Sequence, residues 1–232
     1  MIKIEKVEVF GWESAIRGMR NPMNSWDRSD TEFYYNDDGF QVSIGENDLK
    51  LMKNLSKAGN DDGKFLRMIN VTMDIECSLY WWKEFDTYKV GTVANSCSTM
   101  HKIHAKEFTL DDFSHEHLLD DDNGDNVDDC DWIPVMDDDY YEEWDGVEFL
   151  KATIKALNWY RNRFLKTKNK LYWWQMIQLL PSSYNQKRTV QLNYQVLKTM
   201  YHARKNHKLD EWREFCKWCE TLPYFKEICL DD

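Results

Sequence analysis

The first half of the chain alternates between strand-like and helix-like patterns of hydrophobic residues. Residues 2–9 carry apolar side chains at nearly every second position, which predicts a strand. Residues 49–55 carry them at helical spacing, and Gly59 suits the end of that helix. Residues 65–75 return to mostly alternate apolar positions and predict another strand, and residues 77–88 predict a helix after it. This half is therefore expected to hold a mixed sheet with helices.

The second half of the chain shows helical periodicity from Val147 onward. Four helices are predicted, over residues 147–164, 171–180, 189–207 and 210–222. Pro181 ends the second because proline cannot continue a helix, and Asp210 starts the fourth, where the helix dipole favours negative charge. The expected fold class is α+β, with an N-terminal mixed sheet and a C-terminal helical half in a single domain spanning residues 1–232.

Aspartate crowds the region between these halves, at about residues 111–145. The run from Asp120 to Asp125 is similar to calcium-binding loops, because hard cations prefer oxygen ligands. An EF-hand loop beginning at Asp120 needs glycine at its sixth position and glutamate at its twelfth, where this chain has Asp125 and Asp131. We therefore expect a solvated, flexible insertion and no metal site; an alternative is that the acidic residues fold against the basic helices.

Composition places the chain among globular proteins, at 232 residues, 42% hydrophobic and 15% aromatic. No segment has the apolar run of a signal peptide or a membrane span, so a cytoplasmic location without a membrane partner is expected. The six cysteines are then expected to be reduced. Cys216 and Cys219 have the spacing of a metal or redox pair, but they lack a second pair and are predicted to be buried small hydrophobic residues.

Basic residues concentrate in one stretch of an acidic chain. The formal net charge is -11, from 41 Asp and Glu against 30 Lys and Arg. Residues 151–208 nevertheless hold thirteen Lys and Arg and no acidic residue. This separation predicts a surface that faces an anion.

The same stretch contains a spaced set of residues. The segment Met176–Pro181 is followed after twelve residues by Asn193 and after eleven more by Arg204. This arrangement resembles the flavin-dependent thymidylate synthases, the ThyX family, which have A-R-x-V-L-P, an asparagine and an arginine at this spacing. Ile177 stands where the pattern has its first arginine. The resemblance implies that Arg204 is catalytic and contacts the uracil, that Gln178 contacts the substrate, and that Asn193 contacts the cofactor.

Residues 86–101 carry a second similarity, to the ThyX signature R-H-R-x-x-S-x-N-E-x-S-x-R-Y. Asn95 and Ser98 fall on its asparagine and second serine, and Lys89 stands for one of its basic residues. The resemblance implies that Asn95 and Lys89 bind the cofactor and that Ser98 is catalytic and contacts the nucleotide. The glutamate, last arginine and tyrosine of the signature are replaced here by Ser96, Met100 and His101.

The order of elements over Leu49–Phe85, a helix, a polar loop, a strand and a helix, is also similar to that of the family. Family members have a histidine in the polar loop or early strand. The corresponding positions are Leu66 and Arg67, so this chain lacks that histidine.

Together these similarities imply a homotetrameric enzyme that converts dUMP to dTMP with methylenetetrahydrofolate and reduced FAD, with NADPH as a further co-substrate. An alternative is a protein on the same fold that has lost flavin and binds a nucleotide or another partner. The missing signature charges and Ile177 favour the alternative. Four retained polar residues favour the enzyme: Asn95, Ser98, Asn193 and Arg204.

A third interpretation is a binder of single-stranded nucleic acid. One short segment mixes positive charge with stacking surface, as such proteins do. Its residues are Lys166, Lys168, Lys170, Tyr172, Trp173 and Trp174. The isoelectric point of about 5.1 and the acidic insertion oppose contact with a polyanion, so nucleic acid is not expected as a partner.

Overall fold

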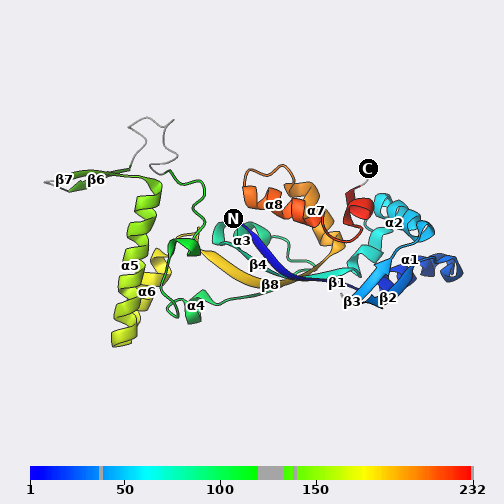
Figure 1. Ribbon diagram of the computed structural model, residues 1–232, viewed down its shortest axis with the longest axis horizontal. Helices are drawn as coiled ribbons and strands as arrows, with labels where there is room; N and C mark the ends of the chain where they lie inside the picture. Colours follow the sequence, from blue (N-terminus) through cyan, green and yellow to red (C-terminus); the bar gives the residue numbers. More distant parts are fainter. Residues whose placement is uncertain (37–38, 120–132, 138–139, 231–232) are drawn as a thin grey trace. The chain divides into compact units, whose positions relative to one another are not determined.

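The computed structural model describes residues 1–36, 39–119, 133–137 and 140–230, and the chain forms two compact units (Figure 1). The unit that we call the sheet unit comprises Ile2–Glu76, Trp81–Asn95 and Lys187–Asp232. The unit that we call the helical unit comprises Met1, Cys77–Tyr80 and Ser96–Gln186. Residues 120–132 and 138–139 of the predicted acidic insertion, including the aspartates compared above with calcium loops, lie outside the described residues. The expectation of a single domain stays a prediction.

A four-stranded sheet organises the sheet unit, with its strands in the order β1-β4-β8-β5 (Figure 1). The strands are β1 (Lys3–Phe10), β4 (Asn70–Ser78), β8 (Asn185–Asn193) and β5 (Val93–Ser96). A separate hairpin pairs β2 (Glu32–Asn36) with β3 (Gly39–Ser43) in antiparallel register. Helices of the same unit are α1 (Trp12–Arg20), α2 (Glu46–Ala58), α7 (Tyr194–Arg204), α8 (Asp210–Cys219) and the π-helix η6 (Lys226–Leu230). Helix α3 (Leu79–Phe85) follows β4.

Only one face of the sheet is deeply buried. Val71, Met73 and Ile75 alternate along β4 with half-exposed polar residues, as expected for a sheet with one covered face. Large aromatic side chains from α3 and α8 extend this core. The indole rings of Trp81 and Trp212 lie 4.8 Å apart by their centroids, and both side chains are fully buried. Aromatic surface thus supplies much of the apolar area that stabilises this unit.

The edge strand β1 is interrupted by a β-bulge. Its pairing with β4 shifts by one residue between Glu5 and Glu8. Lys6, within the bulge, has φ of 52°, a left-handed conformation that is uncommon for a residue other than glycine. Its ammonium group lies 3.6 Å from a carboxylate oxygen of Asp74 on β4. The bulge therefore turns one lysine of the edge back onto the neighbouring strand.

The helical unit is built around an antiparallel pair of helices, α5 (Gly146–Thr167) and α6 (Lys170–Leu179). Asp145 caps α5 in a capping box with Glu148, and Asn169 caps α6. Shorter elements are α4 (Thr99–Lys102), η4 (Leu110–Asp112) and the hairpin of β6 (Ile133–Asp137) and β7 (Tyr140–Trp144). One compact core joins the long helices to the segment before them, and its buried members are Ile103, Phe108, Phe113, Leu150, Ile154, Leu157 and Met176.

Most predicted elements are confirmed. The strand of residues 2–9 is β1, the helix of residues 49–55 lies within α2, and Gly59 follows α2 with φ of 116°. Three of the four predicted C-terminal helices correspond to α5, α6 and α8. The fold is α+β and mixes a sheet with helices as expected.

Two predictions of element type were wrong in part. Residues 189–193 were assigned to a helix but belong to β8, because Val190 and Leu192 alternate inward and fit the buried face of a sheet. The strand predicted from residue 65 begins only at Asn70, and Gly63–Arg67 form the 3₁₀ helix η3. In η3 the adjacent residues Phe65 and Leu66 are both buried, which a half-buried strand does not permit.

Over the described residues, none of the helices is both long and apolar enough to cross a lipid bilayer.

A buried ion pair joins α1 to α2. The Arg20 Nε atom donates to Asp48 Oδ1 at 2.7 Å, and both side chains are almost fully buried. The hydroxyl groups of Ser29 and Thr31 donate to the other carboxylate oxygen at 2.6 and 2.7 Å. Burial raises the pKa of Asp48, but the hydrogen bonds from Ser29, Thr31 and Arg20 outweigh it and lower the pKa below its ordinary value.

We predict that Asp48→Asn destabilises the protein by about 3–5 kcal/mol, because it leaves the Arg20 guanidinium buried without its counterion. Urea unfolding at neutral pH measures this loss, and Asp27→Asn on an exposed carboxylate is the matched control. The lowered pKa gives Asp48 a stabilising contribution that is complete above about pH 4 and declines as pH falls through the folded-state pKa. Equal unfolding free energies for the two variants would contradict the prediction.

Candidate functional site

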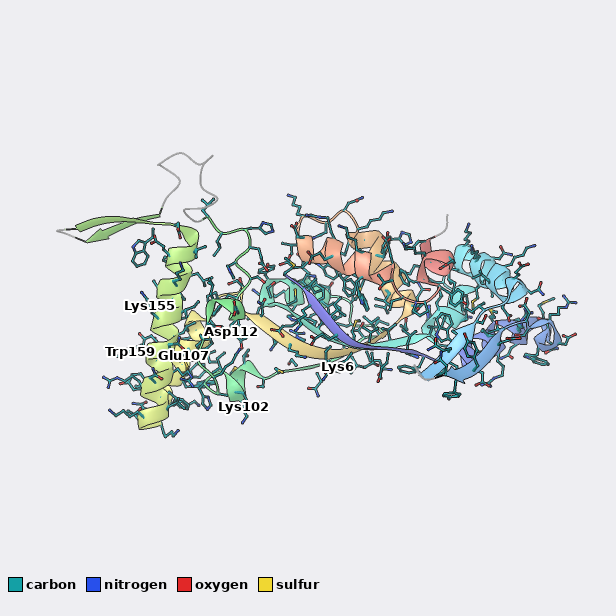
Figure 2. All side chains as sticks on the ribbon, in the orientation of Figure 1. Lys6, Lys102, Glu107, Asp112, Lys155 and Trp159 are labelled. Carbon is teal, nitrogen blue, oxygen red and sulfur yellow. The ribbon has the colours of Figure 1, made fainter. Side chains whose placement is uncertain are left out.

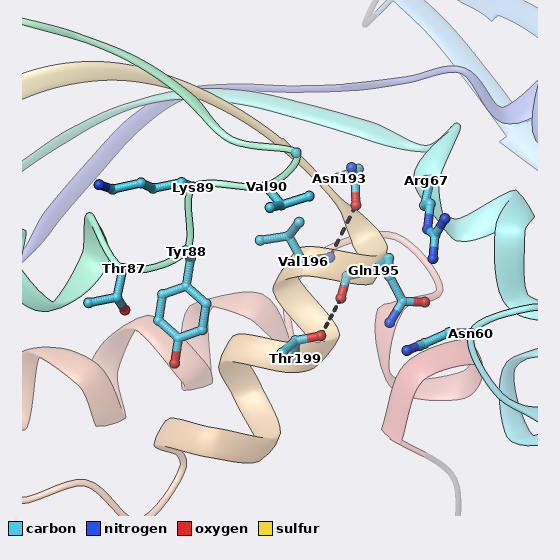
Figure 3. A pocket seen from close by; sticks show the side chains of 11 residues that line it. Asn60, Arg67, Thr87, Tyr88, Lys89, Val90, Asn193, Gln195, Val196 and Thr199 are labelled. Carbon is cyan, nitrogen blue, oxygen red and sulfur yellow. Dashed lines mark hydrogen bonds between the residues drawn. The ribbon is translucent and has the colours of Figure 1, made fainter.

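One pocket of the sheet unit brings together two residues predicted from the sequence. Its volume is about 460 Å³, and its walls come from the turn after α3, the start of α7, and the segment around η3 (Figure 3). The lining residues are Asn60, Arg67, Thr87, Tyr88, Lys89, Val90, Gly91, Asn193, Gln195, Val196 and Thr199. Lys89 and Asn193 were both expected to contact a cofactor, and the pocket places them in one cavity.

The charges around this pocket favour an anion. Arg67 and Lys89 are exposed cations on its wall, and Figure 3 shows them at opposite ends of the space, with the Lys89 ammonium group directed away from Arg67. In the described part of the chain neither forms an ion pair, and none of the lining residues is acidic. The first turn of α7 also lines the pocket, and the N-terminal end of a helix dipole carries partial positive charge. The pocket wall therefore carries positive charge and no lining carboxylate, which suits an anion.

The turn from Thr87 to Gly91 packs closely on the start of α7. Gly91 has φ of 80°, and a Cβ atom at this position would lie 3.1 Å from Asn193 Nδ2 and 3.2 Å from a methyl group of Val196. Asn193 is the N-cap of α7, and its Oδ1 atom accepts a hydrogen bond from the Val196 backbone N–H at 3.1 Å. The cap fixes the side chain of Asn193, and the glycine lets the turn approach it.

Arg204 lies at the end of α7 and is held by other side chains. Its Nη1 atom donates to Glu84 Oε2 at 2.6 Å, and its Nε atom donates to the Tyr88 hydroxyl oxygen at 2.9 Å. The guanidinium carbon is 4.9 Å from the ring centroid of Trp212 and 5.6 Å from that of Tyr88. Arg204 is thus ion-paired and in cation–π contact with two aromatic rings.

The Glu84 carboxylate collects further donors. Trp212 Nε1 donates to Oε2 at 3.0 Å, and His207 Nε2 lies 3.3 Å from the same oxygen. One carboxylate oxygen therefore connects α3, the end of α7, the following loop and α8. Tyr88 belongs both to this cluster, which we call the Glu84 cluster, and to the wall of the pocket.

The remaining predicted residues occupy other positions. Asn95 is exposed on β5 in the sheet unit. Ser98 and Gln178 belong to the helical unit. Ser98 is the N-cap of α4, where its hydroxyl accepts from the His101 backbone N–H at 3.1 Å. Gln178 is exposed on α6. The roles assigned to these three residues, and to Arg204, stay predictions.

Sequence reasoning overlooked Arg67 and Tyr88 as parts of the site. Arg67 had been noted only as a position where the ThyX family has a histidine, although its charge now faces the pocket. Tyr88 directly precedes Lys89, which was predicted to bind the cofactor, and this adjacency is the sequence signal that points to Tyr88. Their proximity to Asn193 depends on the packing of η3 and the turn against α7, which no local pattern reveals.

The pair Cys216 and Cys219 lies on one side of α8, and both side chains are buried. Burial raises the pKa of the Cys216 thiol to about 11 and holds the pKa of Cys219 well above its ordinary value. The prediction that they are buried small hydrophobic residues is confirmed.

Solved structures of ThyX proteins are similar to this chain. A crystal structure of thymidylate synthase X (ThyX) from Helicobacter pylori with FAD and dUMP superposes with a TM-score of 0.63 at 15% identity, covering 100% of this chain and 98% of that one. The chain has a ThyX-like fold. A second ThyX structure from Helicobacter pylori, complexed with FAD and dUMP, gives a TM-score of 0.60 at 15% identity, with coverages of 99% and 98%. No family model and no curated protein matches the sequence.

The contacts of the Glu84 cluster are expected to stabilise the folded protein. Arg204→Ala should lower the free energy of unfolding by about 1.5–3 kcal/mol, because hydrogen bonds to a charged group are lost and Glu84 keeps no arginine partner. Denaturant unfolding measures the effect, with Lys205→Ala on the adjacent exposed lysine as control.

A double-mutant cycle that combines Arg204→Ala with Glu84→Gln tests whether this loss of unfolding free energy comes from the interaction between Arg204 and Glu84. We expect the two substitutions to be non-additive, since each removes the same interaction. Additive losses would mean that Arg204 and Glu84 do not stabilise each other.

Proposed function

We propose that this protein binds a nucleotide through its phosphate group in the pocket between η3, the turn after α3 and α7. The observation that carries the proposal is that two cations, Arg67 and Lys89, line a cavity with no acidic lining residue. Arginine and lysine are the usual partners of phosphate oxygens. The ThyX-like fold supports the proposal, because the similar Helicobacter pylori structures contain FAD and dUMP. Both of those ligands carry phosphate groups.

The other lining residues suit the rest of such a ligand. Tyr88 contributes a flat ring, and Asn60 and Gln195 contribute amide groups that can donate and accept hydrogen bonds. A volume of about 460 Å³ lies within the usual range for small-molecule sites. The donor set thus fits a phosphate with an attached polar ring, and dUMP is the first ligand to test. FAD is the second, through the same cations.

A second candidate is the complete reaction of a flavin-dependent thymidylate synthase, carried out by a homotetramer. Reduced FAD would supply the electrons, with NADPH as the source of reducing equivalents and methylenetetrahydrofolate as the one-carbon donor. The full-length fold similarity favours this candidate. In its terms, Lys89, Asn95 and Asn193 would hold the flavin, and Arg204, Ser98 and Gln178 would contact dUMP. The ion pair between Arg204 and Glu84 favours nucleotide binding without synthesis, because that arginine already has a carboxylate partner.

We predict that Arg67→Ala combined with Lys89→Ala weakens dUMP binding by at least about 10-fold, the loss expected when charged hydrogen bonds to phosphate disappear. Isothermal titration calorimetry measures the affinity. Uridine serves as the uncharged ligand, whose binding should change much less. Lys64→Ala is the matched control, because Lys64 is an exposed cation on η3 that does not line the pocket. Unchanged affinity for dUMP in the double variant would show that the phosphate does not bind in this pocket.

The second candidate predicts a flavin signal and a product. Protein incubated with FAD and then desalted should keep flavin absorbance, and adding dUMP, methylenetetrahydrofolate and NADPH should give dTMP, detected by chromatography. Retained dUMP binding without dTMP would leave the protein as a nucleotide binder. Sedimentation velocity tests the tetramer separately.

A further inference from the structure

A basic face runs along the exposed side of α5 in the helical unit. Its members recur at steps of three or four residues, so they share one side of the helix. We call these residues the α5 face: Lys151, Lys155, Trp159, Arg163 and Lys166. Figure 2 labels Lys155 and Trp159 on α5. Leu150, Ile154 and Leu157 lie on the other side of the same helix, buried in the core of the unit. The α5 face is therefore the solvent side of an amphipathic helix.

The cations of this face have no carboxylate partner in the described part of the chain. All five side chains of the α5 face are exposed, and across the described ranges none of its four cations forms an ion pair. Basic residues of the sheet unit behave differently. Arg188 pairs with Asp86 at 2.7 Å, and Lys187 lies 3.3 Å from both Glu5 and Asp74. The acid-free stretch thus leaves four cations on one side of α5 without an ion pair in the described part of the chain.

Trp159 gives the α5 face a flat aromatic surface. Trp159 is 52% exposed, although removal of a tryptophan side chain from water is strongly favourable. The Arg163 guanidinium carbon lies 5.1 Å from the ring centroid of Trp159, and Tyr172 of α6 contacts the ring edge at 6.1 Å between centroids. The indole is therefore held in place beside a cation while part of its surface remains open.

We propose that the α5 face binds single-stranded nucleic acid, with a base stacked on Trp159 and the flanking phosphates on Lys155, Arg163 and Lys166. Charge complementarity favours a polyanion, because none of the four cations forms an ion pair among the described residues. A base can stack on an aromatic ring only where it is unpaired, which selects a single strand. The chain's overall charge of -11 opposes such contact at long range, but the local field of α5 acts within a screening length of about 8 Å.

The same face is poorly suited to a lipid surface. An interfacial helix needs an apolar side that enters the bilayer, and the apolar side of α5 is occupied by the core of the helical unit. Trp159 is the only apolar member of the α5 face. A surface with one aromatic ring and four cations can contact an unstacked base and its flanking phosphates, but it offers little apolar area to a bilayer.

Fluorescence anisotropy with fluorescein-labelled oligo(dT) and the full-length protein tests the proposal. Trp159→Ala should weaken binding about 5- to 150-fold, the range measured for loss of base–aromatic stacking, and Trp159→Phe should recover most of it. Lys155→Glu with Lys166→Glu should reduce the slope of log affinity against log salt by about 1.4, the value for two phosphate contacts on a single strand. Lys50→Glu with Lys57→Glu on α2 makes the same charge change elsewhere and should leave the slope unchanged.

Several results would overturn the proposal. These are absence of oligo(dT) binding, equal loss in the α2 control, and equally tight binding of duplex DNA of the same length. Capture by phosphatidylserine vesicles in place of oligo(dT) would assign the face to a membrane. Sedimentation velocity is run on every variant, and a change in mass with the α5 substitutions would make this face a contact between copies of the chain. None of these outcomes bears on the pocket of the sheet unit, so the two proposals fail independently.

Discussion

A single half-buried carboxylate, that of Glu84, holds the candidate site in shape. It accepts hydrogen bonds from Arg204 and Trp212 and lies beside His207, so three segments of the chain converge on α3. A carboxylate removed from water needs such partners, and an arginine removed from water needs the carboxylate. Tyr88 bonds to the same arginine and contributes its ring to the pocket, which makes the pocket wall an extension of this cluster.

The acid-free stretch is used in different ways in the two units. In the sheet unit three of its six basic side chains form ion pairs among the described residues: Arg188 with Asp86, Lys187 with Glu5 and Asp74, and Arg204 with Glu84. There the absence of acid within the stretch is compensated by acid from the first half of the chain. In the helical unit the cations of α5 have no such compensation among the described residues. The same acid-free stretch thus forms ion pairs within the sheet unit and leaves exposed positive charge on α5 in the helical unit.

Local sequence patterns predicted the elements whose periodicity is unambiguous. The helices α5, α6 and α8 follow from apolar stripes, from Pro181, and from Asp210 at a helix start. The apolar pattern gave the wrong element at Val190 and Leu192, because two alternating apolar residues are compatible both with a strand and with the helix that follows. Only pairing with β4 decides between these, and pairing is not local. Lys89 and Asn193 were identified from motif spacing, whereas Arg67 was missed because the motif expects a different residue type there.

The bulge in β1 has a consequence for the behaviour of the protein at high concentration. An edge strand offers unpaired N–H and C=O groups, and a regular edge can be extended by a strand from another molecule. The left-handed Lys6 breaks that regular array and places a charged side chain at the edge. A second chain that approached β1 would find its hydrogen-bonding register interrupted after three residues, which opposes growth of a shared sheet along this edge, while β1 stays paired with β4 on both sides of the bulge.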